Sequence, residues 1–306
     1  MKIILIGANG QLGTDLVKAL AKHDVVNAIQ PGTDGGALTN LIDLDVGNSG
    51  AVRAAIAAHK PDVLVNTAAF HRVDDIESDA MAALQVNGYA AQQLALACRD
   101  ADIALLHIST DYVFDGVKRA PYVETDLPNP ISAYGATKLA GELLVRAAWH
   151  KHYIIRPCGL YGTAGAMGKT GASRGGNFVN TMLKLGRGDK PVKVIADQVC
   201  TPTYSKDLAE QIELLISSAK YGTYHTTSDG ACSWYEFARE IFRLAGMSPQ
   251  VIPITSDEYG APAKRPAYSV LENRALREIG IDRMRDWHEA LAEYVSIVEP
   301  GSHPQA

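Results

Sequence analysis

The sequence predicts an α/β fold, with a Rossmann-type doubly wound parallel sheet followed by a smaller C-terminal α/β lobe. A short apolar run at residues 2–6 leads directly into a glycine-rich turn and then an amphipathic helix. Apolar runs then alternate with helical patterns as far as Arg156. After Pro157 this alternation ends, which indicates that a second, smaller unit begins there.

The first half of the chain predicts alternating strands and helices. Short apolar runs indicate strands, and longer segments with apolar residues three or four positions apart indicate helices. In chain order, strands are expected at residues 2–6, 25–29, 41–46, 61–66, 103–108 and 153–156, and helices at 15–21, 49–59, 81–100 and 134–149.

The second half predicts shorter elements after a glycine-rich segment. Residues 163–176 contain five glycines and few apolar residues, so this segment is expected to be either a lid over a ligand or a surface insertion. Helices are expected at 177–185, 207–219, 234–245 and 287–298, and strands at 192–195 and 224–227. We expect residues 1–157 to form the first domain, with elements of about 177–187 and 207–227 added to it, and the remainder of 158–306 to form mainly the second lobe.

Composition and charge argue against several classes of protein. The 306 residues carry a formal net charge of −5 and no basic block, which argues against nucleic acid or a membrane surface as a partner. No apolar stretch has the length of a signal peptide or membrane span, and the four cysteines form no Cys-x-x-Cys pair. His150 and His152 have no third ligand near them in the sequence, so no metal site is expected. We therefore expect a cytoplasmic protein with reduced thiols.

The glycine-rich turn predicts a dinucleotide site. Gly7, Gly10 and Gly13 form a Gly-x-x-Gly-x-x-Gly pattern directly after an apolar strand. Glycines allow a tight turn and a close approach of the backbone to a pyrophosphate, and the N-terminus of the following helix offers free N–H groups. Strand, glycine turn and helix in this order are the context that such a site needs.

The ends of two later strands are expected to contact the same dinucleotide. Asp45 and Val46 end the third strand, where they are placed to touch the adenine. Ala68 and Ala69 end the fourth strand, and such small residues allow either close contact with a cofactor or plain close packing.

The second strand leaves the phosphate state of the cofactor open. An NAD enzyme often has an acid here to hold the ribose hydroxyls, but this chain has Gln30, Pro31 and Gly32. The first arginine of the chain is Arg53, so no guanidinium near the second strand is expected to bind a 2′-phosphate. Because no acid repels that phosphate, NADP(H) is slightly favoured over NAD(H).

Tyr134 and Lys138 are candidate catalytic residues, together with Thr110. The first two are four residues apart, which places them on one face of a helix. A phenol has an ordinary pKa near 10, and an ammonium nearby is expected to lower that pKa, so that the tyrosine can exchange a proton with a substrate. Thr110 follows a predicted strand, at the end where open parallel sheets bind ligands. Spacing alone also fits a surface pair, but the glycine turn favours the catalytic interpretation.

In this order, the glycine turn and the three candidate residues resemble the extended short-chain dehydrogenase/reductase family. Within it, the chain is similar over nearly its whole length to the dTDP-4-dehydrorhamnose reductases, in the stretches GANGQLG, NTAAFHRVDDIESD, STDYVFDG, YGATKLAGE, NFVNTMLKLG, ADQVCTPT and RPAYSVLEN. The resemblance implies that NADPH or NADH reduces the 4-keto group of dTDP-6-deoxy-L-lyxo-4-hexulose to give dTDP-L-rhamnose. It also implies that the C-terminal lobe binds a nucleotide-sugar substrate.

The resemblance further implies roles for individual residues. The catalytic residues would be Thr110, Tyr134 and Lys138. The cofactor would be bound by Gly7, Asn9, Gly10, Gln11, Leu12, Gly13, Asp45, Val46, Ala68, Ala69, Tyr134 and Lys138. The substrate would be bound by Val73, Asp111, Tyr112 and Asn177.

Two departures from the family pattern leave the exact sugar and the nucleotide base open. Gly159 stands where the family often has a tryptophan that would line the sugar pocket, and the glycine-rich loop after Gly162 looks longer than usual. The regulatory β subunit of methionine adenosyltransferase is similar over the same length, and sugar-nucleotide epimerases and dehydratases use the same tyrosine–lysine pair. A non-catalytic subunit and these enzymes are therefore alternatives. The oligomeric state is also open, with a homodimer as one option.

Overall fold

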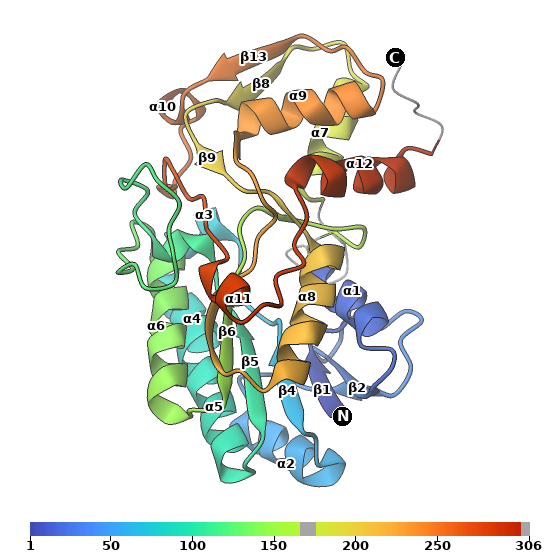
Figure 1. The fold of residues 1–306 in the computed structure, drawn as a ribbon, viewed down its shortest axis with the longest axis vertical. Helices are drawn as coiled ribbons and strands as arrows, with labels where there is room; N and C mark the ends of the chain where they lie inside the picture. The colour runs from blue at the N-terminus through green and yellow to red at the C-terminus, as the bar shows by residue number, and fades with distance from the viewer. Residues whose placement is uncertain (166–175, 301–306) are drawn as a thin grey trace.

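In the computed structural model, which describes residues 1–165 and 176–300, seven parallel strands form a central sheet (Figure 1). Their spatial order is β11-β6-β5-β4-β1-β2-β3. The predicted Rossmann-type parallel sheet is therefore confirmed. The strands are β1 (Lys2–Ile6), β2 (Asp24–Ile29), β3 (Leu41–Asp43), β4 (Val63–Asn66), β5 (Ala104–Ile108), β6 (His152–Arg156) and β11 (Gly222–His225).

The strand order places a ligand site at the carboxyl ends of β1 and β4. The chain starts at β1 in the middle of the sheet, adds β2 and β3 on one side, and then returns to add β4, β5, β6 and β11 on the other. At such a reversal the connections leave toward opposite faces, so a crevice opens beyond the carboxyl ends of the strands. The glycine turn follows β1 and residues 67–69 follow β4, and both segments line a cavity there.

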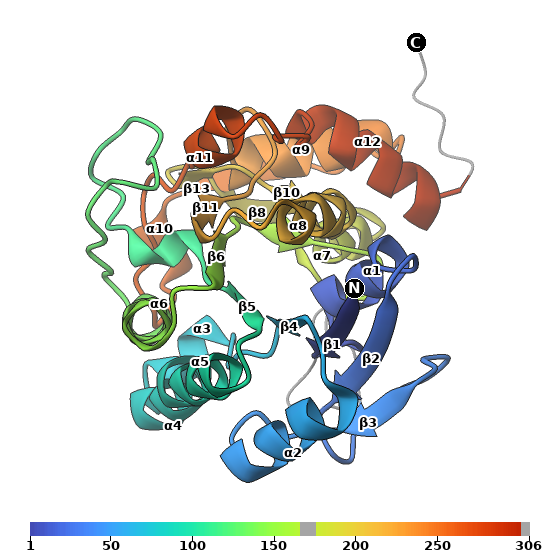
Figure 2. The same ribbon diagram turned by 60° about the horizontal axis from the view of Figure 1, so that its bottom comes forward.

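Helices cover both faces of the sheet (Figure 2). In β1, Ile3 and Leu5 pack in the core shared with α1 and α8, while Ile4 and Ile6 pack in the core shared with α2 and α5. Because alternate side chains of a strand point to opposite faces, burying both faces requires strands that are apolar throughout. The helices of this part are α1 (Gln11–Ala19), α2 (Ser49–His59), α3 (Val73–Ile76), α4 (Ala80–Leu84), α5 (Ala91–Asp100), α6 (Ala133–Ala148) and α8 (Ser205–Ser218).

The long helix predicted at 81–100 is interrupted by a π-helical segment. The π segment, η1 (Gln85–Ala90), lies between α4 and α5. Its Asn87 side chain accepts a hydrogen bond from the Phe70 N–H and donates to the Phe70 carbonyl, both at 2.9 Å, and donates to Thr137 Oγ1 at 3.1 Å. These contacts tie the segment after β4 to α6. The apolar periodicity did not show the interruption, because the tertiary contacts of one amide select it.

A second core lies beyond the carboxyl edge of the sheet (Figure 1). Its largest side chains come from α9, from α12 and from the neighbouring segments, and it includes a parallel pair of strands, β8 and β13. Its elements, with short pieces that connect it to the sheet, are β7 (Leu160–Tyr161), α7 (Phe178–Gly186), β8 (Val192–Ile195), β9 (Val199–Cys200), β10 (Thr203–Tyr204), β12 (Cys232–Ser233), α9 (Trp234–Leu244), β13 (Val251–Ile254), α10 (Ser256–Tyr259), α11 (Arg274–Glu278) and α12 (Trp287–Val298).

Helix α7 belongs to this second core. Val179, Met182 and Leu183 pack in one cluster with Phe237 and Phe242 of α9. The expectation that residues 177–187 add to the first domain is therefore wrong, because the apolar face of a helix does not specify which core it covers. By contrast, β11 pairs with β6, and α8 packs on the same sheet face as α1. Residues 166–175 of the expected lid or insertion lie outside the described residues.

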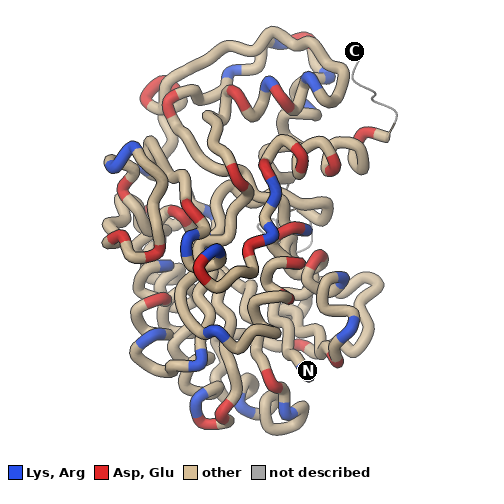
Figure 3. Tube along the Cα trace, in the orientation of Figure 1, with Lys and Arg blue, Asp and Glu red and all other residues tan. Residues whose placement is uncertain are grey.

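The charged residues show no segregation along the chain. Figure 3 shows Lys and Arg interspersed with Asp and Glu along the trace. Within residues 1–165 and 176–300, no helix combines the length and the apolar character that crossing a bilayer requires.

A buried ion pair holds α6 against the sheet. Arg156, at the end of β6, donates to both carboxylate oxygens of Glu142 in α6, at 2.8 and 2.6 Å. The Arg156 and Glu142 side chains are 1% and 0% exposed. Ser109, just after β5, donates to the same carboxylate at 2.6 Å. The bidentate geometry and the third donor satisfy the carboxylate, which is the condition for tolerating such a pair away from water.

We predict that Glu142→Gln lowers the free energy of unfolding by about 3–5 kcal/mol, because it leaves the Arg156 guanidinium buried without its counter-charge. Urea denaturation measures the change. Glu240→Gln is the matched control, since it breaks a pair with the largely exposed Arg243 and is expected to cost less than about 1 kcal/mol. Equal losses in the two variants would contradict the importance of the buried pair.

Candidate active site

One large cavity lies between the carboxyl edge of the sheet and the second core, with a volume of about 970 Å³. Most of the residues predicted for the site line it. These are Gly7, Asn9, Gly10, Gln11, Leu12, Asp45, Val46, Ala68, Ala69, Val73, Thr110, Asp111, Tyr112, Tyr134 and Lys138.

Gly13 and Asn177 are two predicted residues that the structure does not place on the cavity lining. Gly13 lies under the turn, where its backbone packs on Gly7 and Ala8. Asn177 is buried, donates to the Gly162 carbonyl and the Tyr294 hydroxyl, and caps α7 by accepting from the Asn180 N–H. Its side chain therefore anchors α7, and its predicted contact with the substrate stays a prediction.

The glycine turn has the geometry that a dinucleotide needs. Gly7 has φ of +80°, which favours glycine. A Cβ on Gly13 would collide with the Gly7 carbonyl oxygen and lie 2.8 Å from the backbone of Ala8. Helix α1 starts at Gln11 with Gly10 as its N-cap, and no side chain caps it. Backbone N–H groups at this N-terminus are thus available to a pyrophosphate.

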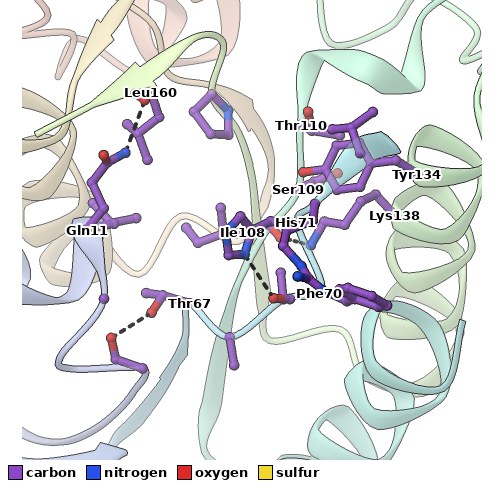
Figure 4. Close-up of a pocket in the computed structure, with 18 of the residues that line it drawn as sticks. Gln11, Thr67, Phe70, His71, Ile108, Ser109, Thr110, Tyr134, Lys138 and Leu160 are labelled. Carbon is purple, nitrogen blue, oxygen red and sulfur yellow. Dashed lines mark hydrogen bonds between the residues drawn. The ribbon is translucent and has the colours of Figure 1, made fainter. Parts of the chain in front are cut away.

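Asn9 and Gln11 connect the turn to its surroundings. Asn9 donates to Thr33 Oγ1 at 3.0 Å and to the Asp34 carbonyl at 3.1 Å, which holds the segment after β2 beside the turn. Gln11 donates to the Leu160 carbonyl at 3.0 Å (Figure 4). Its Oε1 atom is buried without a partner among the described residues. The turn therefore presents an acceptor that a bound cofactor could satisfy, and these residues fit a nicotinamide dinucleotide.

The three candidate catalytic residues converge on the other side of the cavity (Figure 4). Thr110 follows β5 and caps the 3₁₀ turn η2 (Asp111–Val113) by accepting from the Tyr112 N–H. Tyr134 lies in the first turn of α6, which is capped by Ser132. The structure thus brings Thr110, Tyr134 and Lys138 together, from two separate elements.

Lys138 is held by the backbone of the sheet and not by the tyrosine. Its Nζ donates to the Ile108 carbonyl at 2.5 Å. Burial lowers the pKa of Lys138 to about 8, although the carboxylate of Glu142 opposes this shift. An ammonium with this pKa loses its proton partly near neutral pH.

Burial also decides the pKa of Tyr134. It raises the pKa to about 12, while the hydrogen bond from Thr110 lowers it and the nearby Asp111 carboxyl raises it further. The expectation that Lys138 lowers this pKa is therefore wrong, because burial has the largest effect and Lys138 is not among the groups that shift the pKa of Tyr134. A phenol of this kind keeps its proton at neutral pH, as a proton donor must.

The chain from Phe178 onward supplies a wall of the cavity that the sequence did not predict. This wall includes Phe178, Gln198, Cys200, Trp234, Arg265 and Ser269. Gly159 has φ of +53°, and a Cβ there would lie 3.2 Å from Pro202 Cα and 3.4 Å from the Trp234 ring. The indole of Trp234 therefore borders the space beside Gly159, where the family often has a tryptophan. Such residues carry no local signal, because they join the site only through folding.

No group of three or more His, Cys, Asp or Glu side chains with the arrangement of a metal site occurs in the described part of the chain.

Comparison with known proteins identifies the family. Residues 1–299 match the family described as "RmlD substrate binding domain". The chain belongs to this family. It is 40% identical to a dTDP-4-keto-6-deoxy-D-glucose reductase of Streptomyces niveus, over 95% of each chain.

Two solved structures agree with this assignment. A dTDP-4-dehydrorhamnose reductase from Clostridium acetobutylicum is 42% identical, with a TM-score of 0.87 over 97% of this chain and 99% of that one. The dTDP-4-dehydrorhamnose reductase from Bacillus anthracis, in complex with NADP, is 36% identical, with a TM-score of 0.85 over 96% and 98%. The protein is an oxidoreductase of the dTDP-4-dehydrorhamnose reductase type, in a family of NAD(P)H-dependent dTDP-4-keto sugar reductases.

We predict that Gly13→Ala weakens NADPH binding at least about tenfold, equivalent to about 1.4 kcal/mol, because the new methyl group displaces the backbone of the turn. Isothermal calorimetry measures the affinity. Gly50→Ala is the control, since its Cβ would meet only the Asn48 side chain at 3.4 Å in α2, away from the cavity. Unchanged NADPH affinity in Gly13→Ala would show that the turn does not bind the cofactor.

Proposed function

We propose that the protein uses NAD(P)H to reduce the 4-keto group of a dTDP-6-deoxy-4-keto sugar, giving dTDP-L-rhamnose or a close relative. The observation that carries this proposal is the convergence of Thr110, Tyr134 and Lys138 on the cavity that also contains the glycine turn. The relatives named above include enzymes for two different dTDP sugars. The family therefore supports the type of reaction, reduction of a 4-keto group, but does not single out one sugar.

Two arginines support an anionic, nucleotide-linked substrate. Arg72 and Arg265 both line the cavity. Arg265 is held by Asp74 through contacts of 3.1 and 3.0 Å, while Nη1 of Arg72 is buried without a partner among the described residues. Guanidinium groups match the geometry of phosphate oxygens. We assign these two residues to the diphosphate of the sugar nucleotide.

The chain's own residues supply the proton and the orientation. When bound, a nicotinamide supplies a hydride to the carbonyl carbon. Tyr134 gives its proton to the oxygen that becomes the alkoxide, and the charge of Lys138 stabilises the phenolate that remains. Thr110 donates a hydrogen bond to the same oxygen. Lys138, one turn from Tyr134, would also hold the ribose next to the nicotinamide.

For Tyr134→Phe we predict a fall in kcat of about 10²–10⁴-fold with a similar KM, because the variant loses the proton donor and little else. Lys138→Met is expected to lose both rate and cofactor affinity, and Thr110→Val to lose less than Tyr134→Phe. The assay follows oxidation of NADPH with 4-keto sugar nucleotides. Tyr221→Phe, a partly exposed tyrosine outside the cavity, is the control.

The same assay separates the alternatives. A regulatory subunit would bind the cofactor without oxidising it, and an epimerase or dehydratase would convert the sugar without net oxidation. Near-full turnover by Tyr134→Phe would place the proton donor elsewhere and overturn the mechanism.

We also predict that NADPH binds more tightly than NADH, by less than about tenfold. Gln30 and Thr33 line the cavity after β2, and neither repels a 2′-phosphate nor offers it a positive charge. Calorimetric titration with both cofactors decides this, and a preference for NADH would contradict it.

A further inference from the structure

Trp234 brings an aromatic side chain to the cavity from a well-fixed point of the backbone. It is the first residue of α9, and it lines the cavity. The helix is capped by Ser233, whose hydroxyl accepts from the Glu236 N–H at 3.1 Å, while the Glu236 carboxylate accepts from the Ser233 N–H at 2.8 Å. This reciprocal cap satisfies two backbone donors and fixes the first turn of the helix. The backbone of Trp234 is therefore held in one conformation at the edge of the cavity.

Other aromatic rings support the indole of Trp234. The Phe178 ring lies 4.6 Å from it, centroid to centroid, with an angle of 45° between the ring planes. The ring of Phe237, which is buried in the second core, lies 6.2 Å away. Trp234 itself is only partly buried and packs at the edge of that core. The indole is therefore held by neighbouring rings and still has apolar surface left for a ligand.

Gly159 leaves this indole uncovered. It also lines the cavity, and its φ of +53° lies in the left-handed region that favours glycine. A Cβ on Gly159 would lie 3.4 Å from Cη2 of Trp234 and 3.2 Å from Pro202 Cα. A side chain at this position would therefore begin in contact with the six-membered ring of the indole. Because glycine has no side chain, nothing from residue 159 covers that ring.

A series of contacts places the indole at the catalytic end of the cavity. Trp234 packs against an apolar cluster that includes Cys158 and Cys200. The Cys158 thiol donates to Oδ2 of Asp111 at 3.2 Å, and Asp111 follows Thr110 in the chain. Cys158 follows β6 and Thr110 follows β5, whereas the residues expected to touch the adenine follow β3, at the opposite edge of the sheet. The indole therefore borders the region where the ketone of the proposed substrate would lie.

The chemistry of a sugar ring suits an indole. The carbons of a pyranose present C–H groups, and a 6-deoxy sugar also carries a methyl group at C5. Such groups gain free energy when they leave water, and an aromatic ring offers them a large apolar surface. A diphosphate is charged and gains nothing from an apolar surface. Of the parts of a sugar nucleotide, the sugar thus fits a position beside both the indole and the catalytic residues.

We propose that Trp234 forms the apolar wall of a sugar subsite, where its indole packs against the pyranose ring of the nucleotide-linked sugar. This proposal rests on the function proposed above and names a residue that determines how much the sugar adds to the affinity of its nucleotide. The indole transfers no proton and supplies no charge to the ketone. Its contact is the same before and during hydride transfer, so its loss affects substrate binding and not the chemical step.

A comparison of two ligands isolates the contact with the sugar. Calorimetric titration gives the affinities of dTDP and of dTDP-L-rhamnose, and their ratio measures the contribution of the sugar. Trp234→Ala should lower this ratio about tenfold and change the affinity for dTDP by less than about twofold. Trp234→Phe keeps an aromatic face and should retain most of the ratio. Tyr235→Ala is the matched control and should leave the ratio unchanged, because Tyr235 is the next residue of α9 and lies outside the cavity lining.

Tryptophan fluorescence tests the contact without deleting the aromatic ring, and so without the risk that Trp234→Ala fails to fold. The chain has three tryptophans, and Trp149 and Trp287 are not among the residues that line the cavity. Wild-type emission should change more with dTDP-L-rhamnose than with dTDP, and Trp234→Phe should lack this difference. A wild type without the difference, or a variant that keeps it, would overturn the proposal. Thermal unfolding and NADPH affinity confirm that each variant is folded.

These measurements separate the sugar subsite from the proposed reaction. With 4-keto sugar nucleotides as substrates, Trp234→Ala should raise KM about tenfold and change kcat by less than about threefold. If Trp234→Ala lowers the binding ratio but the wild type oxidises no NADPH with these substrates, the proposed function alone is wrong. If the wild type reduces them but Trp234→Ala leaves the ratio unchanged, or weakens dTDP and dTDP-L-rhamnose equally, the sugar subsite alone is wrong.

Discussion

The buried pair of Glu142 and Arg156 fixes the position of α6 on the sheet, and the chemistry of the site depends on that position. Arg156 ends β6, Glu142 lies in α6, and Ser109 after β5 donates to the same carboxylate. Three elements are therefore joined at one point, one helical turn from Lys138. Because a buried ion pair tolerates little change in distance, it holds the helix in one register against the carboxyl ends of the strands. Because Tyr134 and Lys138 lie in the same helix, this contact also fixes their orientation.

Close approach of the backbone adds a second constraint on the same helix. A Cβ on Gly141 would collide with the Asn87 carbonyl oxygen, and one on Gly135 would collide with that of Tyr112. Helix α6 therefore packs tightly on the π-helical segment and on the turn that contains Asp111. The Asn87 amide bonds to Phe70 and to Thr137, the residue before Lys138. These contacts fix the side chains of the cavity in place before any ligand binds. Groups that are already in place can stabilise the charge of a transition state without first rearranging.

Local patterns predicted the parallel sheet, the glycine turn and the position of Thr110, because each depends on residues close together in the chain. The final helix, Trp287–Val298, has the bounds that its apolar periodicity predicts. The interruption at Asn87 and the packing of α7 did not follow from periodicity, since both depend on which distant surface each element contacts. The internal contacts of Asn177 did not follow from the local pattern either, because its amide bonds to Gly162 and to Tyr294.

The sequence by itself determined which groups are present and how they repeat: an apolar strand before three spaced glycines, a tyrosine and a lysine one turn apart, and a threonine at a strand end. Only the tertiary structure decided the environment of those groups. Desolvation raises the pKa of Tyr134 where a charge four residues away was expected to lower it. Folding also brings Cys158 and Ser269 to Asp111, and Trp234 to Gly159. The hydration of a side chain and its contacts with distant residues depend on the folded structure around it. The spacing of residues along the chain does not specify them.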